Sequence, residues 1–390
     1  MRPSQTLSSV QAPIIPAVNE WIRNTPGTLS LGQGMVSYPP PATALEALQH
    51  FGRQPSDHQY GPAFGLPALL TAIEKKLREE NAIDCPKNGD YSIMVTAGSN
   101  MAFLNTLLAI ADPGDEIILP LPYYFNQEMA IRMLNCTPVF VPTDANYQLQ
   151  IDQIRRAITG KTRAIVTVSP NNPSGAVYPE QALRAVNALC QEFGLYHISD
   201  EAYEYFTYDG ATHFSPGSIK DAQKHTISLY SLSKAYGFAS WRIGYMVFPK
   251  DLQPNLLKVQ DTNLICPPLA TQYAALSALE TGASYCRAQL PTLSRVRTTV
   301  IEQLKALEDL CETPITNGGF YFLLKLSGTT GNDLELVKKL VQHYQVAALP
   351  GSAFGLSQGC HLRLSYGMLD MANAKIAMAR LISGITAHCQ

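Results

Sequence analysis

The chain alternates between short, continuous apolar runs and longer segments whose apolar residues recur at helical spacing. The apolar runs lie at 92–96, 116–120, 137–141, 163–169, 195–198, 226–230 and 242–248. Between them, segments such as 66–80 and 180–193 place apolar residues on one face of a helix. Strands and helices that alternate at intervals of about 25 to 35 residues predict an α/β domain with a doubly wound, mostly parallel sheet.

The C-terminal part of the chain predicts a second, smaller unit. Strands at 320–324, 346–349 and 361–365 alternate with helices at 333–344 and 371–385, which is typical of an α+β domain. Residues 1–40 are rich in proline and show no sustained periodicity before the run at 28–34. We therefore expect an N-terminal segment at 1–40 that packs with the small domain, a large domain at 41–290 and a small C-terminal domain at 291–390.

Composition and charge narrow the classes of function. The 390 residues are 46% hydrophobic and 15% charged, with a formal net charge of -2 and no basic block. Nucleic acid and anionic membranes are therefore not expected as partners, and a small-molecule substrate is favoured. The eight cysteines are scattered without C-x-x-C spacing, which argues against a disulfide framework and a zinc site. Without a signal peptide or a run of membrane-spanning length, we expect a cytoplasmic protein.

The stretch 231–242, Ser-Leu-Ser-Lys-Ala-Tyr-Gly-Phe-Ala-Ser-Trp-Arg, directly follows the apolar run at 226–230. A lysine that a strand end places in a dry pocket loses its charge more easily and reacts as an amine nucleophile with a carbonyl group. Most lysines are instead solvated surface charges. Lys234 gains a catalytic interpretation only if the chain also offers a phosphate site, a partner for a ring nitrogen and a clamp for a carboxylate.

Three further features are candidates for those roles. The turn at 97–102 links a strand to a helix, so its free N–H groups suit a phosphate, although many such turns bind nothing. Asp200 ends an apolar run and needs a partner, for which a protonated pyridine nitrogen, a helix N-terminus and a salt bridge are all open. Arg363 lies between leucines in a strand, and its planar guanidinium suits a carboxylate better than a lysine would.

Four motifs follow one another along the chain: Pro-Asn-Asn-Pro-Ser-Gly at 170–175, Asp-Glu-Ala-Tyr at 200–203, the stretch 231–242, and Arg363. On these motifs the chain resembles the class I/II, fold-type-I pyridoxal-phosphate aminotransferases over nearly its whole length. The resemblance implies an α/β fold whose large domain has a mostly parallel seven-stranded sheet between helices, plus a smaller α+β domain. It also implies pyridoxal 5′-phosphate as the cofactor, without a metal.

The resemblance implies a role for each matching residue. Lys234 would bind the cofactor covalently and later move the proton of the substrate Cα. Asp200 would keep the ring nitrogen protonated. Asn172 and Tyr203 would hydrogen-bond the phenolic oxygen, with Tyr203 counted among the catalytic residues, and Tyr124 would stack on the ring. The cofactor phosphate would be held by Gly98, Ser99, Asn100, Ser231, Ser233 and Arg242.

The same resemblance implies how the substrate and a partner subunit are bound. The substrate α-carboxylate would be held by Gly34, Asn172 and Arg363, which leaves the side chain to Met35, Val36, Tyr38 and neighbouring residues. Tyr60, in a glycine-flanked loop, matches a tyrosine that reaches the cofactor phosphate of the other subunit. A homodimer with shared active sites is therefore expected.

The choice of substrate depends on a departure from the family pattern. Aspartate-specific relatives carry an arginine ahead of a Pro-Pro pair, and alignment on Pro267 and Pro268 puts Asp261 at that place, where it would repel a distal carboxylate. The stretches 31–34 and 265–268 look closer to the kynurenine-, glutamine- and methionine-type branch. We therefore expect a ping-pong transaminase that takes an apolar or aromatic L-amino acid and a 2-oxo acid.

Two alternatives use the same fold. A C–S β-lyase or an ACC-synthase-like enzyme shares the ring, the lysine and the carboxylate clamp, and differs only in the fate of the bound substrate. Some bacterial transcription regulators use the fold as a non-catalytic ligand-sensing domain, but they carry a DNA-binding segment ahead of it. Since only residues 1–40 precede the large domain here, we rank the transaminase first.

Overall fold

A computed structural model describes residues 2–85, 89–327 and 332–388. A seven-stranded sheet organises the larger part of the molecule, with the strand order β2-β8-β7-β6-β5-β3-β4. Only β8 runs antiparallel to its neighbours, β2 and β7, so the predicted mostly parallel sheet is confirmed. The strands are β2 Tyr91–Thr96, β3 Glu116–Leu121, β4 Thr137–Pro142, β5 Thr162–Val168, β6 Tyr196–Asp200, β7 Thr226–Ser231 and β8 Gly244–Pro249.

Helices cover both faces of this sheet, which explains why its strands are apolar throughout rather than alternating. Neighbouring residues in one strand pack into different cores: Ile117 lies in the core beneath α4, and Ile118 lies in the core beneath α7. The helices of this part are α2 Ala42–His50, α3 Pro67–Glu80, α4 Ser99–Ile110, α5 Phe125–Met133, α6 Ile151–Ala157, α7 Glu180–Phe193, α8 Leu232–Ala235, α9 Gln253–Asn263 and α10 Leu269–Thr281.

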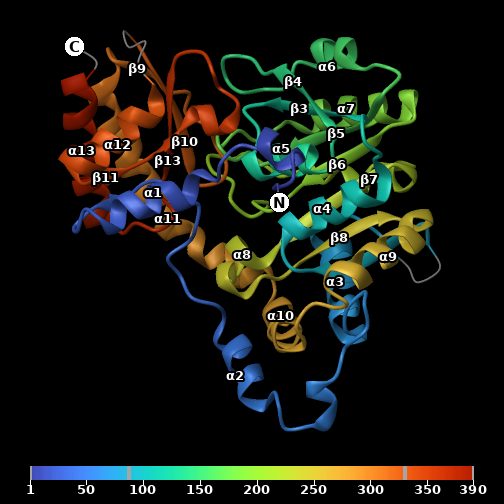
Figure 1. The fold of residues 1–390 in the computed structure, drawn as a ribbon. Coiled ribbons are helices and arrows are strands. Elements are labelled where there is room, and N and C mark those ends of the chain that lie inside the picture. The colour runs from blue at the N-terminus through green and yellow to red at the C-terminus, as the bar shows by residue number, and fades with distance from the viewer. Residues whose placement is uncertain (1, 86–88, 328–331, 389–390) are drawn as a thin grey trace.

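The C-terminal part forms a second, four-stranded antiparallel sheet in the order β12-β13-β10-β9. Its strands are β9 Cys311–Glu312, β10 Tyr321–Leu326, β12 Leu349–Pro350 and β13 Cys360–Ser365, and α11 Ala283–Leu304, α12 Asp333–Tyr344 and α13 Met371–His388 complete this part. Figure 1 shows these orange and red elements beside the large sheet, whose labelled strands run from teal through green to yellow. The expected domain boundary near 290 falls inside α11, so one continuous helix joins the two parts.

The strand expected at 346–349 is divided between two sheets. β11 Val346–Ala347 pairs with β1 Leu29–Ser30 from the N-terminal segment, whereas β12 pairs with β13. A run of apolar residues carries no information about which neighbour each residue pairs with, because every residue in it is equally suited to burial.

The N-terminal segment contains a helix, α1 Ile14–Arg23, that the sequence interpretation did not include. Its apolar residues recur strongly at helical spacing, so the signal was present. The helix is only ten residues long, and it lies in a proline-rich stretch that was interpreted as irregular. Pro16 lies in the first turn, where a missing N–H is tolerated. In Figure 1 this dark blue helix lies against the orange and red part, and it contacts α12. Among the described residues, no helix is both long enough and apolar enough to cross a membrane.

Candidate active site

The carboxyl ends of β5, β6 and β7 open into a cavity of about 310 Å³ that β10 and β13 of the other sheet close. Such a crevice, at the carboxyl ends of parallel strands, is the usual ligand site of an open α/β sheet. All predicted site residues except Gly98 and Tyr60 line it: Gly34, Ser99, Asn100, Tyr124, Asn172, Asp200, Tyr203, Ser231, Ser233, Lys234, Arg242 and Arg363. Segments from residue 34 to residue 363 therefore converge on one space.

Lys234 lies in α8, the one-turn helix that follows β7 directly. The helix starts because the Ser231 side chain accepts a hydrogen bond from the Ser233 N–H at 3.1 Å. Burial lowers the pKa of Lys234 to about 8, and the positive charges of Arg242 and Arg363 act in the same direction. The neutral fraction of the amine near physiological pH is therefore far larger than that of an ordinary lysine, as a nucleophile requires.

One end of the cavity is built for an anion. The twelve-residue helix α4 begins at Ser99, so its free N–H groups point toward the cavity beside the hydroxyls of Ser231 and Ser233. Arg242 donates from Nη1 to Ser233 Oγ at 3.3 Å and to Ala239 O at 3.0 Å. Its backbone has a φ of 52°, which is rare outside glycine and is typical of functional sites. Hydroxyls, a helix N-terminus and one guanidinium together fit a phosphate group.

Gly98 contributes space rather than a lining atom. A Cβ at this position would lie 2.7 Å from Arg242 Nη2, and the backbone φ is 83°. Only glycine adopts this conformation without strain and also leaves room for the guanidinium. Gly98 was expected at the phosphate site, and it lies beside Arg242 at the position that precedes α4.

Asp200 ends β6 and is buried. Its carboxylate accepts hydrogen bonds from the Ala202 N–H at 3.2 Å and from Gln127 Nε2 at 2.9 Å. Burial raises the pKa of Asp200 to about 6 against the opposing effect of these donors. Within the described residues Asp200 has no cation in an ion pair, so a ligand that brings a protonated ring nitrogen would supply the missing charge.

Arg363 lies on β13 and is 2% exposed. Nη1 donates to Asn172 Oδ1 at 2.9 Å and Nη2 donates to Gly32 O, while Nε has no partner in the described structure. No carboxylate of the described chain pairs with it. A buried guanidinium that hydrogen-bonds only neutral groups and borders a cavity is suited to an incoming carboxylate.

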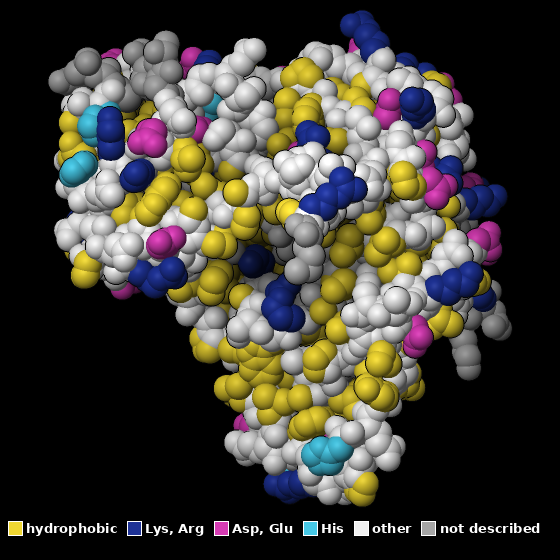
Figure 2. Space-filling view, in the orientation of Figure 1, with side chains coloured by type: hydrophobic (Ala, Val, Ile, Leu, Met, Phe, Trp, Pro, Cys, Tyr) yellow, Lys and Arg dark blue, Asp and Glu magenta, His cyan; other side chains and the backbone are white. Residues whose placement is uncertain are grey.

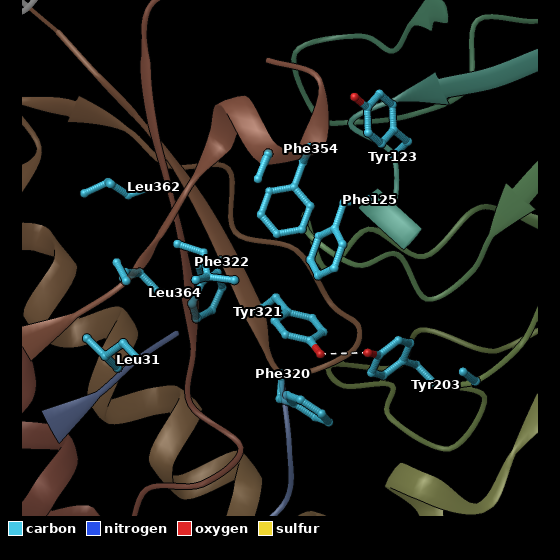
Figure 3. Packing of buried hydrophobic residues seen from close by; sticks show 14 of the residues in the cluster. Leu31, Tyr123, Phe125, Tyr203, Phe320, Tyr321, Phe322, Phe354, Leu362 and Leu364 are labelled. Carbon is cyan, nitrogen blue, oxygen red and sulfur yellow. Dashed lines mark hydrogen bonds between the residues drawn. The ribbon is translucent and has the colours of Figure 1, made fainter. Parts of the chain in front are cut away.

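The Tyr203 hydroxyl lies between the two sheets. It accepts a hydrogen bond from Asn172 Nδ2 at 3.4 Å and lies 2.7 Å from the Tyr321 hydroxyl. Figure 3 shows these two hydroxyls pointing toward each other, with Phe125 and Phe354 packed nearby. Tyr124 precedes α5 and lines the same side of the cavity as Phe125. The resulting aromatic wall suits a planar ring.

The residues expected to select the substrate side chain are only partly at the cavity. Met35 lines it, whereas Val36 is buried elsewhere. The Tyr38 hydroxyl donates to the Lys234 carbonyl at 2.7 Å, so Tyr38 supports the turn that carries the lysine instead of lining the cavity. The expected role of Val36 and Tyr38 in direct side-chain contact is therefore not seen in this chain.

Several lining residues escaped the sequence interpretation: Ile15, Asn19, Gln33, Phe125, Val168, Ala202 and Tyr321. Asn19 lies four residues after Ile15 on the apolar side of α1, and a polar residue on an apolar face was the available signal. Gln33 Nε2 donates to Asn19 Oδ1 at 3.2 Å. Tyr321 belongs to an apolar strand, and such a residue is ordinarily interpreted as part of the hydrophobic core. Gln127 hydrogen-bonds Asp200 in the folded chain. Nothing in the sequence around Gln127 indicates this contact, because only the fold brings the two residues together.

Two residues lie away from the cavity. The Tyr60 side chain is 81% exposed, and Asp261 is exposed near the end of α9. Neither lines the cavity within one chain. In the part of the chain that the structure describes, no three or more His, Cys, Asp or Glu side chains are grouped to hold a metal ion.

Comparison with known proteins gives consistent results. Residues 26–381 match the family described as "Aminotransferase class I and II". The chain is 34% identical to "Aromatic aminotransferase ISS1" of Arabidopsis thaliana over 384 residues, which cover 96% of this chain and 93% of that protein. It is 34% identical over 335 residues to "Probable aspartate/prephenate aminotransferase" of Aquifex aeolicus, covering 84% and 82%. A solved Thermus thermophilus aspartate aminotransferase mutant superposes with a TM-score of 0.90 at 31% identity, covering 98% of this chain and all of that chain.

Proposed function

Because the chain belongs to the class I and II aminotransferases, which use pyridoxal phosphate to move amino groups, we propose that this cofactor occupies the cavity and is bound covalently by Lys234. The observation that carries the proposal is the convergence of four groups on one space. They are a lysine of lowered pKa, an anion site around Arg242, a buried carboxylate at Asp200 and a buried guanidinium at Arg363. Each matches a different part of the cofactor–substrate pair.

When bound, pyridoxal phosphate supplies an electron-withdrawing ring that eases removal of the substrate Cα proton. Asp200 holds the proton on the ring nitrogen, and Tyr203 and Asn172 hydrogen-bond the phenolic oxygen. Arg363, with the backbone at Gly34, orients the substrate through its α-carboxylate. The Lys234 amine removes the proton from the substrate Cα and delivers it to the reacting carbon of the cofactor. Amino acid and 2-oxo acid bind in turn at the same carboxylate site, which gives ping-pong kinetics.

The donor that we propose is an apolar or aromatic L-amino acid. The cavity near α1 is bordered by Ile15, Met35 and Phe125 and by the neutral amides of Asn19 and Gln33. The three cations that line the cavity, Lys234, Arg242 and Arg363, bind the cofactor or the substrate α-carboxylate in this proposal. The Arabidopsis relative is named an aromatic aminotransferase, which supports this choice, while other relatives are named for aspartate. Because the stretches 31–34 and 265–268 look closer to the kynurenine-, glutamine- and methionine-type branch, we also propose that this chain belongs to that branch.

We further propose a homodimer in which Tyr60 reaches the partner subunit's cofactor phosphate. Figure 2 shows hydrophobic side chains gathered over the lower part of the molecule, where Figure 1 places α2 and α10. The loop that carries Tyr60 is attached there by a hydrogen bond from the Gly61 N–H to Cys266 Sγ at 3.3 Å. Mixing a Tyr60→Phe chain with a Lys234→Ala chain should restore cofactor binding at one site of each mixed dimer. Absence of any recovery would contradict the shared site.

A cytoplasmic location is also proposed. The buried thiols of Cys85, Cys190 and Cys286 suit a reducing compartment. Fractionation of cells that express the full chain tests this location, and recovery of the protein outside the cytoplasm would contradict it.

The test of the function compares three proteins loaded with pyridoxal phosphate. The wild type should show a visible absorption band and transaminate. Lys234→Ala should lose both, while Lys258→Ala, which removes an exposed lysine on α9, should keep both. A Lys234→Ala protein with full transamination would refute the assignment. A panel of amino acids against several 2-oxo acids then identifies the donor, and a strong preference for aspartate or glutamate would refute the apolar or aromatic choice.

A further inference from the structure

Tyr321 is a buried cavity residue that the roles above do not use. It is the first residue of β10, is 0% exposed and lines the cavity. Its hydroxyl lies 2.7 Å from that of Tyr203, and the two rings meet edge to face at 80° with centroids 5.4 Å apart. Because Tyr203 follows β6 and Tyr321 belongs to the smaller sheet, this hydrogen bond joins the two parts of the molecule across the site.

We propose that Tyr321 is a positioning residue that donates its hydroxyl proton to Tyr203 and so directs the Tyr203 proton toward the phenolic oxygen of the cofactor. This inference rests on the proposed function, since it concerns the same cofactor. Tyr321, a residue of the small sheet, would thereby affect the protonation of the Lys234 nitrogen.

The proposal follows from counting hydrogen-bond donors. A phenol has one proton to donate and two positions that accept. Asn172 Nδ2 already donates to the Tyr203 oxygen. If Tyr321 also donates, both accepting positions are filled and the single Tyr203 proton remains for the cavity. If Tyr203 donated to Tyr321 instead, no proton would be left for the cofactor oxygen.

The Arg363 charge favours Tyr321 as the donor, because the guanidinium carbon lies 4.8 Å from the centre of the Tyr321 ring. Burial raises the pKa of Tyr321 to about 12, and the nearby Arg363 charge opposes that rise. Burial raises the pKa of Tyr203 well above its usual value, and its contacts with Tyr321 raise it further.

The surroundings hold the Tyr321 hydroxyl in place. The Arg363 guanidinium carbon lies 4.8 Å from the centre of the Tyr321 ring, an arrangement that the register of β10 and β13 produces by pairing Leu323 with Arg363. On the other side, a Cβ at Gly34 would overlap the Tyr321 hydroxyl. The hydroxyl is therefore confined between the N-terminal segment and Tyr203.

Removal of the Tyr321 hydroxyl should shift the protonation of the Lys234 nitrogen in the cofactor-loaded enzyme in one direction. A Tyr203 hydroxyl without its donor is a weaker and less oriented acid, so the cofactor's phenolic oxygen keeps more negative charge. That oxygen then holds the neighbouring proton on the Lys234 nitrogen more tightly. Tyr321→Phe should therefore move the pH at which the visible band changes upward, by about 0.4 to 1 pH unit for one hydrogen bond.

The experiment is a spectrophotometric pH titration of four cofactor-loaded variants without substrate: Tyr321→Phe, Tyr203→Phe, the double variant and Tyr366→Phe. Tyr366 is a matched control, because it is 1% exposed and belongs to the same part of the molecule but does not line the cavity. Tyr321→Phe should shift the transition upward, the control should not, and the double variant should titrate like Tyr203→Phe. Thermal melting confirms that each variant is folded.

Two results would overturn the inference. One is a Tyr321→Phe transition at the wild-type pH. The other is a double variant whose shift equals the sum of the single shifts, since Tyr321 would then act independently of Tyr203. A wild type that never develops a visible band would instead refute the proposed function itself, so the two failures are distinguishable.

Discussion

Gly98→Ala tests whether the anion site depends on the space that Gly98 leaves for Arg242. The new methyl group would lie 2.7 Å from Arg242 Nη2 and 3.3 Å from the guanidinium carbon. Atoms this close are displaced by several tenths of an ångström, so the guanidinium moves away from Ser233 and from the start of α4. The substitution therefore changes the phosphate site without removing any of its hydrogen-bonding groups.

Two separate contributions set the size of the effect. At a φ of 83° and a ψ of 171°, a region that is open essentially only to glycine, an alanine costs about 1–3 kcal/mol in backbone strain, which lowers the free energy of unfolding. Displacement of Arg242 weakens a charge-assisted hydrogen bond of about 1.5–3 kcal/mol, so cofactor affinity should fall about 10- to 100-fold. The first contribution acts on stability and the second acts on binding, and they are measured independently.

Gly114→Ala is the matched control. Gly114 also has a positive φ, 94°, but a Cβ there would meet nothing within 4 Å. Both variants should lose stability in thermal melts of the apoprotein, because both alanines stand at a positive φ. Titration of the apoprotein with pyridoxal phosphate should show weakened binding for Gly98→Ala alone. Equal affinities for the two variants would refute the argument that Gly98 is required to make room for the guanidinium.

Two further predictions concern charge in the cavity. Burial raises the pKa of Asp200 from 3.8 to about 6, so the unfolded chain loses this proton first and the apoprotein should lose stability as pH rises between those values. Asp200→Asn should remove that loss in melts over about pH 4 to 7, and an unchanged pH profile would show that Asp200 is not perturbed. Asn19→Lys places a cation beside the proposed side-chain site, so kcat/KM for aspartate should rise relative to phenylalanine by about tenfold. A ratio that stays constant, with Asn19→Gln as the neutral control, would place the substrate side chain elsewhere.

The sequence was most informative where the chemistry is local. The lysine after β7, the aspartate at the end of β6 and the glycine–serine turn before α4 each stand at the boundary of a predicted element. That boundary determines which edge of the sheet they occupy. Seven apolar runs predicted the seven strands, because a strand covered on both faces carries a continuous apolar signal.

The features that the sequence did not predict share a different physical cause. α1 is strongly amphipathic but only ten residues long, and a helix of that length is stable only when its apolar face packs, here against α12 and β12. Tyr38 stands beside the substrate segment in sequence, yet its hydroxyl bonds the backbone of Lys234 from outside the cavity. Gln127 lies on a helix with no chemical motif, and it reaches Asp200 only because α5 packs over the end of the sheet.

Sequence alone therefore determined the seven strands of the large sheet, the sheet type and the residues whose chemistry is indicated by their own neighbours in the chain. Tertiary structure decided which of them share a cavity and which group each one faces. The Tyr203–Tyr321 contact joins residues 118 positions apart, one in the turn that follows β6 of the large sheet and one on β10 of the small sheet. A hydrogen bond of this kind depends on the distance and direction between two side chains, and neither is encoded by the residues around either tyrosine. It is set by how the two sheets pack.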